Sequence, residues 1–212
     1  VLHAQGFHAL TLNGDLDQRE RDQVLIQFAN RSCSVLVATD VAARGLDIAQ
    51  LEAVINVDVT PDPEVHIHRI GRTGRGDDDG WALSLCSSAD KRRIATIAQM
   101  MGIEPEWHDI GELQGGDDTP LLPPMVTLQI LGGRKEKIRP GDVLGALTGE
   151  AGFSKEQVGK INVTDTSTYV AVARDIAWRE PDHSNNPSAD SASGAPTQAR
   201  RSKPTAGSSA PP

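Results

Sequence analysis

The sequence of 212 residues predicts an α/β fold, in which a mostly parallel sheet has helices on both faces. Strand-like apolar runs alternate with helical patterns over residues 1–103, and two of those runs are rich in β-branched residues. A second compact pattern, over residues 125–173, has the order strand, helix, strand, strand. That order matches a small β-α-β-β-α-β sandwich without its second helix and fourth strand. We therefore expect an incomplete second domain after the first.

The elements of the first region carry local start and stop signals. Asp62 followed by Pro63 is the pattern of an N-cap and a first helical residue, and Gly102 follows an apolar helical stripe that it can terminate. The expected elements are a strand at 8–12, a helix opening at Asp15, buried strands at 35–38 and 53–57 with a short helical turn at 41–45 between them, a helix from Asp62 to about Gly71, a strand at 81–86 and a helix ending at Gly102.

The later elements follow from the same kind of pattern. A strand is expected at 126–131, a helix at about 140–148, a capped turn opening at Ser154, and two strands at 160–163 and 169–173. Residues 104–124 hold six acidic residues and no lysine or arginine, which indicates a linker, and residues 181–212 contain no large apolar side chain, which indicates disorder. The predicted domains are therefore 1–103, the linker 104–124, a truncated domain at 125–178 and a tail at 179–212.

Composition limits the classes of protein to which the chain can belong. No apolar run approaches the length of a membrane-spanning helix, and the first residues lack a secretory signal pattern, so we expect a cytoplasmic protein. Cys33 and Cys86 fit neither a disulfide framework nor a zinc ribbon. The first residue is valine, so we expect the natural N-terminus elsewhere. The net charge of −8 taken alone argues against a nucleic-acid partner.

The stretch VATDVAARGLDI, residues 37–48, is the first candidate site. Thr39 and Asp40 come directly after a buried strand, at the edge where open α/β sheets bind ligands. Arg44, Gly45 and Asp47 add a guanidinium, an accessible backbone and a carboxylate that suit phosphate and ribose. An ordinary strand–turn–helix with an aspartate cap is the alternative.

The stretch HRIGRTGR, residues 68–75, is the second candidate site. Arg72 and Arg75 are three residues apart, so they share one face, while Gly71 and Gly74 let a ligand approach. Guanidinium groups placed at a transferring phosphate stabilise its charge. A solvated basic turn that pairs with residues 77–79 is the alternative.

Together the two stretches resemble motifs V and VI of DEAD-box RNA helicases, in their second RecA-like domain. The stretch LNGDLDQRERDQVLIQF, residues 12–28, resembles the preceding segment of that family, which touches the RNA backbone. The resemblance implies arginine fingers at Arg72 and Arg75, nucleotide contacts at Gly45 and Asp47, interdomain coupling through His68, and RNA contacts at Gly14, Gln18, Arg21, Thr39 and Asp40.

The stretches RPGDVLGALTGEAGF and VGKINVTDTSTYVAV resemble the RRM-like RNA-binding module of the DEAD-box protein A subfamily. That resemblance implies that residues 125–178 anchor the protein on a hairpin of large-subunit ribosomal RNA. Tyr169 is the only aromatic residue on a predicted strand of this module, so loop contacts are favoured over base stacking. The basic cluster suited to phosphates is Arg134, Lys135, Lys137 and Arg139; a solvated loop balanced by Glu136 is the alternative.

These resemblances predict an ATP-dependent RNA helicase that remodels ribosomal RNA during large-subunit assembly, with ATP and Mg²⁺ as cofactors and a monomeric state. The chain has neither a P-loop nor a D-E-A-D motif, so we expect the Mg²⁺ ligands in a first RecA-like domain outside it and no ATPase activity from the 212 residues alone. A non-enzymatic RNA-binding or RNA-chaperone protein and a DNA translocase of the same superfamily are the rival hypotheses.

Overall fold

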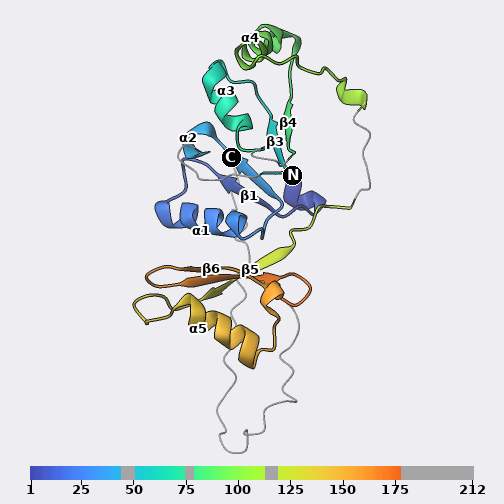
Figure 1. Ribbon diagram of the computed structural model, residues 1–212. Coiled ribbons are helices and arrows are strands. Elements are labelled where there is room, and N and C mark those ends of the chain that lie inside the picture. Colours follow the sequence, from blue (N-terminus) through green and yellow to red (C-terminus); the bar gives the residue numbers. More distant parts are fainter. Residues whose placement is uncertain (44–50, 75–78, 113–118, 178–212) are drawn as a thin grey trace, which may run out of the picture. The chain divides into compact units, whose positions relative to one another are not determined.

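The computed structural model describes residues 1–43, 51–74, 79–112 and 119–177 (Figure 1). By its contacts, the stretch Val1–Arg179 forms one compact unit. None of the helices within the described ranges has both the length and the apolar character that crossing a membrane requires.

The first part of the chain, residues 1–112, is built from strands that pair in parallel, as predicted. Strand β1 pairs with β2, placing Leu12 opposite Ala38, and β3 pairs with β4, placing Asn56 opposite Ser84. The elements are β1 (Ala9–Leu12), α1 (Gln18–Ala29), β2 (Val35–Ala38), α2 (Asp40–Ala43), β3 (Ala53–Asn56), α3 (Pro63–Ile70), β4 (Trp81–Ser84) and α4 (Lys91–Met101).

Helix α1 begins later than the sequence pattern predicts. The N-cap is Asp17 rather than Asp15: its carboxylate accepts from the Glu20 amide at 2.8 Å, and the Glu20 carboxylate accepts from the Asp17 amide at 2.9 Å. Such a reciprocal pair satisfies two backbone donors at once, whereas Asp15 is held in a local turn with Asn13. The predicted caps of the other two helices are confirmed at Asp62 and Gly102.

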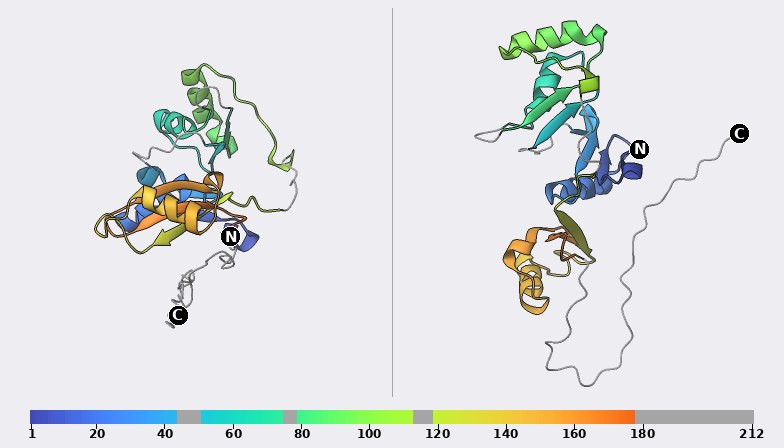
Figure 2. Two further views of the ribbon diagram at one scale, coloured as in Figure 1. Left: turned by 60° about the horizontal axis from the view of Figure 1, so that its bottom comes forward. Right: turned by 90° about the vertical axis from the view of Figure 1, so that its right-hand side faces the viewer.

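One face of the β3–β4 pair is more exposed than the sequence predicts. The sequence pattern predicts a fully buried run, but Ile55 is 61% exposed and Val57 is 72% exposed. Strand residues alternate between faces, and Asn56, on the opposite face from Ile55, is buried. Helices α3 and α4 pack together beside these strands (Figure 2), and Val59, Ile94 and Ile97 form the core there. Among the described residues, the helices cover only the face of the pair that carries Asn56.

The second part, residues 119–177, has the predicted order of strand, helix, strand, strand. Strands β5 (Met125–Ile130), β6 (Val158–Val163) and β7 (Thr168–Ala173) form an antiparallel sheet in the order β5-β7-β6. Helix α5 (Pro140–Gly145) is followed by a π-helical turn, Ala146–Glu150, where the sequence predicts the helix to continue to residue 148. Val143 of α5 packs on Val170 and Val172 of β7 and closes the core of this part.

Candidate nucleic-acid interface

Strands β1 and β2 bring two of the predicted RNA contacts to one edge. Leu12 lies opposite Ala38, so Gly14 and Thr39 both follow the carboxyl ends of paired strands. A side chain at Gly14 would meet open space, which means that the fold does not itself require glycine there. Thr39 is exposed. This edge can therefore admit an extended ligand close to the backbone.

Helix α1 adds two more predicted contacts to the same edge. Arg21 donates to the carbonyl of Ala42 at 3.1 Å, which ties α1 to the short helix α2 directly after Thr39. Gln18 lies exposed on the first turn of α1 and donates to Asp22 at 2.7 Å. The structure thus gathers Gly14, Gln18, Arg21 and Thr39 around the ends of β1 and β2.

Asp40 is engaged in a way that the sequence pattern did not predict. Arg69 of α3 donates to both oxygens of the Asp40 carboxylate, from Nε and from an Nη, at 2.6 Å each. The side chain of Arg69 is only 20% exposed and that of Asp40 35% exposed, so this fork is partly shielded from water. The hydrogen bond to Asp40 raises the pKa of Arg69 above its ordinary value, despite the opposing effect of burial. The fork connects the two candidate stretches physically.

Arg69 is the residue that sequence reasoning missed. The available signal was the spacing in HRIGR, where Arg69 lies three residues before Arg72 and therefore about one helical turn away. A guanidinium at that position and a carboxylate directly after β2 are complementary, but only the packing of α3 brings them together. A direct role for Asp40 in RNA binding stays a prediction, and its occupied oxygens favour a linking role.

The end of α3 holds the described part of the predicted nucleotide site. Arg72 is half-buried, and its carbonyl accepts from the Leu51 amide at 3.0 Å. Thr73 bonds the Leu51 carbonyl, and a side chain at Gly80 would clash with Thr73. His68 is exposed on α3. The predicted contacts at Arg44, Gly45, Asp47 and Arg75 lie outside the described residues.

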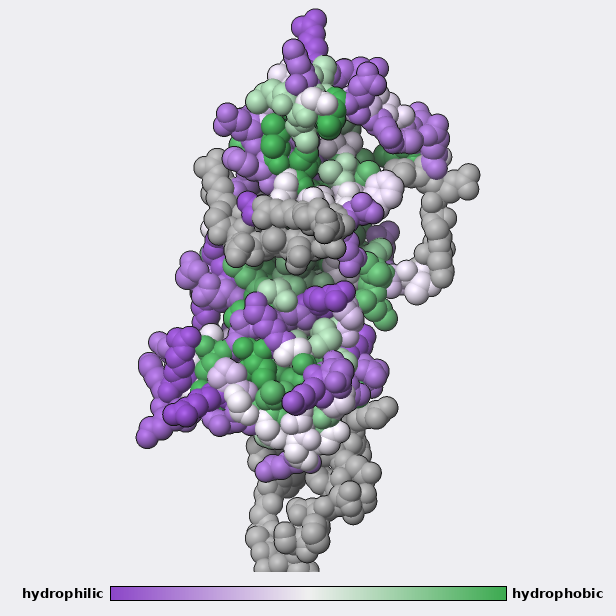
Figure 3. Space-filling view, viewed as in Figure 1, coloured by the Kyte–Doolittle hydropathy of each residue, from purple (hydrophilic) through white to green (hydrophobic). Residues whose placement is uncertain are grey.

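The basic loop of the second part, Gly132–Arg139, is fastened to the turn between β6 and β7. The amide of Arg134 donates to the Thr164 carbonyl at 2.9 Å, and the amide of Lys135 donates to the Asp165 carbonyl at 3.0 Å. A Cβ at Gly133 would come within 2.3 Å of the Thr164 carbonyl oxygen, so the loop packs closely there. Figure 3 shows strongly hydrophilic side chains at the end of this part that carries the loop.

The four predicted basic side chains all point into solvent-accessible space. Arg134, Lys135, Lys137 and Arg139 are exposed, and Arg134 makes an exposed ion pair with Asp165 at 3.4 Å. The carboxylate of Glu136, the proposed counter-charge, instead accepts from the Gly133 amide at 2.7 Å. Glu136 therefore shapes the loop, and the cationic groups stay available for phosphate oxygens.

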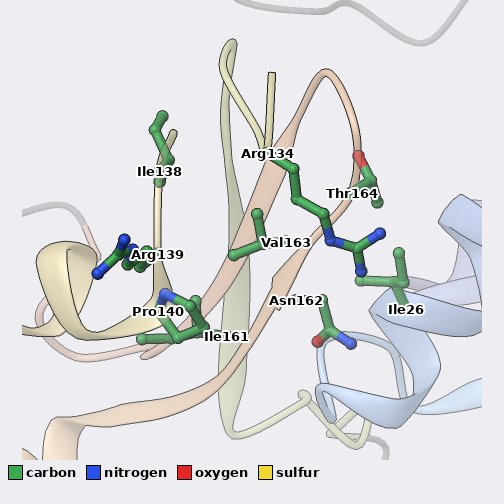
Figure 4. A pocket seen from close by; sticks show the side chains of 9 residues that line it. All are labelled: Ile26, Arg134, Ile138, Arg139, Pro140, Ile161, Asn162, Val163 and Thr164. Atoms are coloured by element: carbon green, nitrogen blue, oxygen red, sulfur yellow. The ribbon is translucent and has the colours of Figure 1, made fainter. Parts of the chain in front are cut away.

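A hollow borders this loop and includes two of the four basic residues (Figure 4). Arg134 reaches over the strand that carries Asn162, and Arg139 lies where α5 begins. Tyr169 is buried, with its hydroxyl accepting from Gln129 at 3.3 Å. This geometry agrees with contacts through the loop in preference to base stacking on the sheet. The lining residues from the second part are Arg134, Ile138, Arg139, Pro140, Ile161, Asn162, Val163 and Thr164.

Within the described ranges, no three His, Cys, Asp or Glu side chains gather in a way that suits a metal ion. Among the described residues, Arg72 and the backbone around Gly74, whose φ of 60° is typical of glycine, fit the phosphates of ATP. They suit a phosphate, since a half-buried guanidinium beside accessible backbone is complementary to its oxygens. They offer no Mg²⁺ ligands.

Comparison with known families matches both parts of the chain. Residues 1–77 match the family described as the helicase conserved C-terminal domain, and residues 127–183 match the DbpA RNA binding domain. The first match contains the edge formed by β1 and β2, and the second contains the basic loop.

Individual relatives agree with this pairing of domains. The ATP-dependent RNA helicase DbpA of Escherichia coli K12 is 48% identical over 183 residues, which are 85% of this chain and 40% of that protein. The Bacillus subtilis protein of the same name is 32% identical over 79% of this chain and 39% of its own length. The chain thus spans about two fifths of each relative. The crystal structure of E. coli DEAD-box protein SrmB bound to regulator of ribonuclease activity A is 33% identical, covers 53% of this chain and 66% of that one, and gives a TM-score of 0.48.

Proposed function

The chain belongs to the DEAD-box helicases of the DbpA type, and on that premise we propose that it supplies the C-terminal RecA-like domain and the RNA-binding module of an ATP-dependent RNA helicase. One observation supports this most directly. The Arg69–Asp40 fork ties the helix that leads to Arg72 to the edge where Thr39, Gly14 and Arg21 gather. One partly shielded ion pair thereby joins the helix that leads to the proposed nucleotide site and the edge that we propose faces the RNA.

In this proposal the described residues divide the work between two ligands. ATP, when bound, would supply the γ-phosphate that is transferred to water. Arg72, and with it Arg75, would hold the charge on that phosphate, since a positioned guanidinium stabilises a transferring phosphoryl group. Gly14, Gln18, Arg21 and Thr39 would hold one RNA strand by its backbone, and His68 would contact the first RecA-like domain. Asp47 and Gly45 would meet the nucleotide, and Mg²⁺ would be held by the first domain.

The RNA-binding module would bring the enzyme to its substrate. Arg134, Lys135, Lys137 and Arg139 present four cations from a loop that is anchored by backbone hydrogen bonds. Such an arrangement suits a folded RNA, whose phosphates lie close together. We propose a hairpin of large-subunit ribosomal RNA as the target, a role in large-subunit assembly, a cytoplasmic location and a monomeric state. The domain bounds 1–103, 104–124, 125–178 and 179–212 belong to the same proposal.

The first test joins the whole chain to the part of the E. coli relative that precedes the matched region. We expect this chimera to hydrolyse ATP faster when a ribosomal RNA hairpin is added, and Arg72→Ala to lower kcat by about 100-fold or more. Arg92→Ala, at an exposed arginine on α4, is the matched control and should leave kcat unchanged. The 212 residues alone should bind the hairpin without hydrolysing ATP.

The outcomes separate the rival functions. A non-enzymatic RNA binder would bind the hairpin but show no RNA-stimulated ATPase activity in the chimera. A DNA translocase would be stimulated at least as well by duplex DNA as by RNA. Either result would contradict the proposed function.

A further inference from the structure

Asn56 lies outside the two candidate stretches, yet it occupies the centre of a hydrogen-bond network that reaches into both. It is the last residue of β3 and is only 3% exposed. Its amide nitrogen donates to the Leu83 carbonyl at 3.4 Å and to the Ser84 hydroxyl at 3.2 Å, both on β4. Its amide oxygen accepts from Arg69 at 3.3 Å. One buried side chain therefore links β3, β4 and α3.

The Arg69 guanidinium is held from three sides. The Asp40 carboxylate accepts hydrogen bonds from Nε and one Nη of Arg69. The other Nη donates to the Asp58 carbonyl at 2.9 Å and to the Asn56 amide oxygen. A planar guanidinium with this many partners has a fixed orientation, because its donors point in set directions. Arg69 cannot turn toward a ligand without breaking the network, so its role is to hold Asp40 in place.

Asn56 fixes where that guanidinium lies relative to the sheet. Asp40 and Asp58 stand on segments that lead out of β2 and β3, whereas Asn56 lies within β3 and is bonded to β4. The path Ser84, Asn56, Arg69, Asp40 thus runs from the sheet to the residue next to Thr39. Arg72 lies three residues beyond Arg69, directly after the C-cap of the same helix.

We propose that Asn56 is a positioning residue, which sets the register between the Arg72 end of α3 and the Thr39 edge and thereby links ATP turnover to RNA binding. This inference rests on the proposed function, since it concerns how its two ligand sites communicate. While its hydrogen bonds fix the orientation of Arg69, a displacement of α3 also displaces Asp40. Without the bonds of Asn56, Arg69 can reorient and the displacement does not reach Asp40.

The test uses the chimera described above and measures the ratio of RNA-stimulated to RNA-independent ATPase activity. Asn56→Ala should lower this ratio by about 5-fold or more and raise the KM for RNA, because coupling energies between sites are of that order. Asn56→Asp keeps the size of the side chain but competes with Asp40 for Arg69, so it should lower the ratio as well. Ser84→Ala removes only one outer bond and should have a smaller effect.

Controls separate positioning from general stability. Thr96→Ala removes an exposed hydroxyl bonded within α4, and should leave the ratio unchanged. Arg69→Lys combined with Asn56→Ala should be no worse than Arg69→Lys alone, because both act through one guanidinium. Circular dichroism identifies variants that fail to fold, and Asn56→Asp keeps the test decisive if Asn56→Ala is one of them.

Each outcome bears on a different claim. If the unmodified chimera shows no RNA-stimulated ATPase activity, the proposed function fails. If it does and both folded Asn56 variants keep the full ratio, with only their melting temperatures lowered, the positioning role is overturned. A reduced ratio at unchanged KM for ATP supports it.

Discussion

Among single residues, Arg69 and Asp40 form the polar contact whose removal should be most costly. The fork is bidentate and partly shielded from water. Loss of either side chain therefore leaves the other charge partly desolvated and without its ion-pair partner. We expect Arg69→Met to lower the free energy of unfolding of the chain by about 2–4 kcal/mol. Urea titration measures the change.

The exposed pair Arg93–Asp90 provides the matched control. Its atoms are 3.0 Å apart, and the Arg93 side chain is 51% exposed. The Asp90 side chain is 18% exposed but also accepts two hydrogen bonds from Ser87, so it keeps partners when Arg93 is removed. Solvent screens such a pair, so Arg93→Met should cost less than about 1 kcal/mol. Equal losses for the two arginines would show that the fork contributes no more than a surface contact.

The buried side chain of His66 on α3 should make the folding stability of the chain depend on pH. Burial, followed by the charge of Arg69, lowers the pKa of His66 below 6.5 in the folded chain, and its Nδ1 has no hydrogen-bond partner within the described ranges. The unfolded chain binds the proton more readily, so stability is full above pH 6.5 and is lost as the pH falls below it.

Melting temperatures between pH 8 and pH 5 test this expectation. His66→Leu removes the group and should flatten the decline below pH 6.5. Some decline should remain, because burial also lowers the pKa of His8. An identical decline in His66→Leu and in the unmodified chain would exclude His66 as a cause.

Among secondary-structure elements, the start of α1 distinguishes two aspartates that the sequence pattern treats alike. Asp17 completes the capping box with Glu20, whereas Asp15 exchanges hydrogen bonds with Asn13 in a local turn. Asp17→Ala should therefore cost about 1 kcal/mol of stability and Asp15→Ala only a few tenths. Thermal unfolding of both variants decides between the positions, and a larger loss for Asp15→Ala would contradict the cap that the structure shows.

The sequence predicts elements better than it predicts their surroundings. Helix α3 with its Asp62 cap, helix α4 with Gly102 and the bounds of strand β2 lie as predicted, because their signals are local. The predicted burial of β2 is wrong, since Val37 is 48% exposed. The exposure of Ile55 was missed, since an apolar run does not say which face a helix covers.

The site shows the same limit. Gly14 and Thr39 could be placed at one edge because parallel strands end together. The contacts Arg69–Asp40 and Arg69–Asn56 join residues 29 and 13 positions apart, and depend on how α3 packs on the sheet. No spacing rule within one element encodes such a contact.

For the whole molecule, the distribution of charge matters more than its sum. The chain carries 21 basic and 29 acidic residues, yet residues 104–124 contain six of the acids and none of the bases. Four of the basic residues lie in the loop 134–139, on an anchored backbone. Charges separated by more than about 10 Å are largely screened at ordinary ionic strength, so the charges close to a bound phosphate matter more than the total.

The dependence of RNA binding on salt tests whether local charge governs it. If the loop neutralises three or four phosphates of a single-stranded RNA loop, the logarithm of the binding constant should fall against the logarithm of salt with a slope of about −2 to −3. Lys135→Ala should make the slope shallower by about 0.7, because it removes one phosphate contact. Lys155→Ala, at an exposed lysine outside the loop, is the control and should leave the slope unchanged. Fluorescence anisotropy with the full chain provides the measurement.

Equal slopes for Lys135→Ala and the unmodified chain would place the RNA elsewhere. The expected difference would show that a chain of net charge −8 binds RNA through a few well-placed cations.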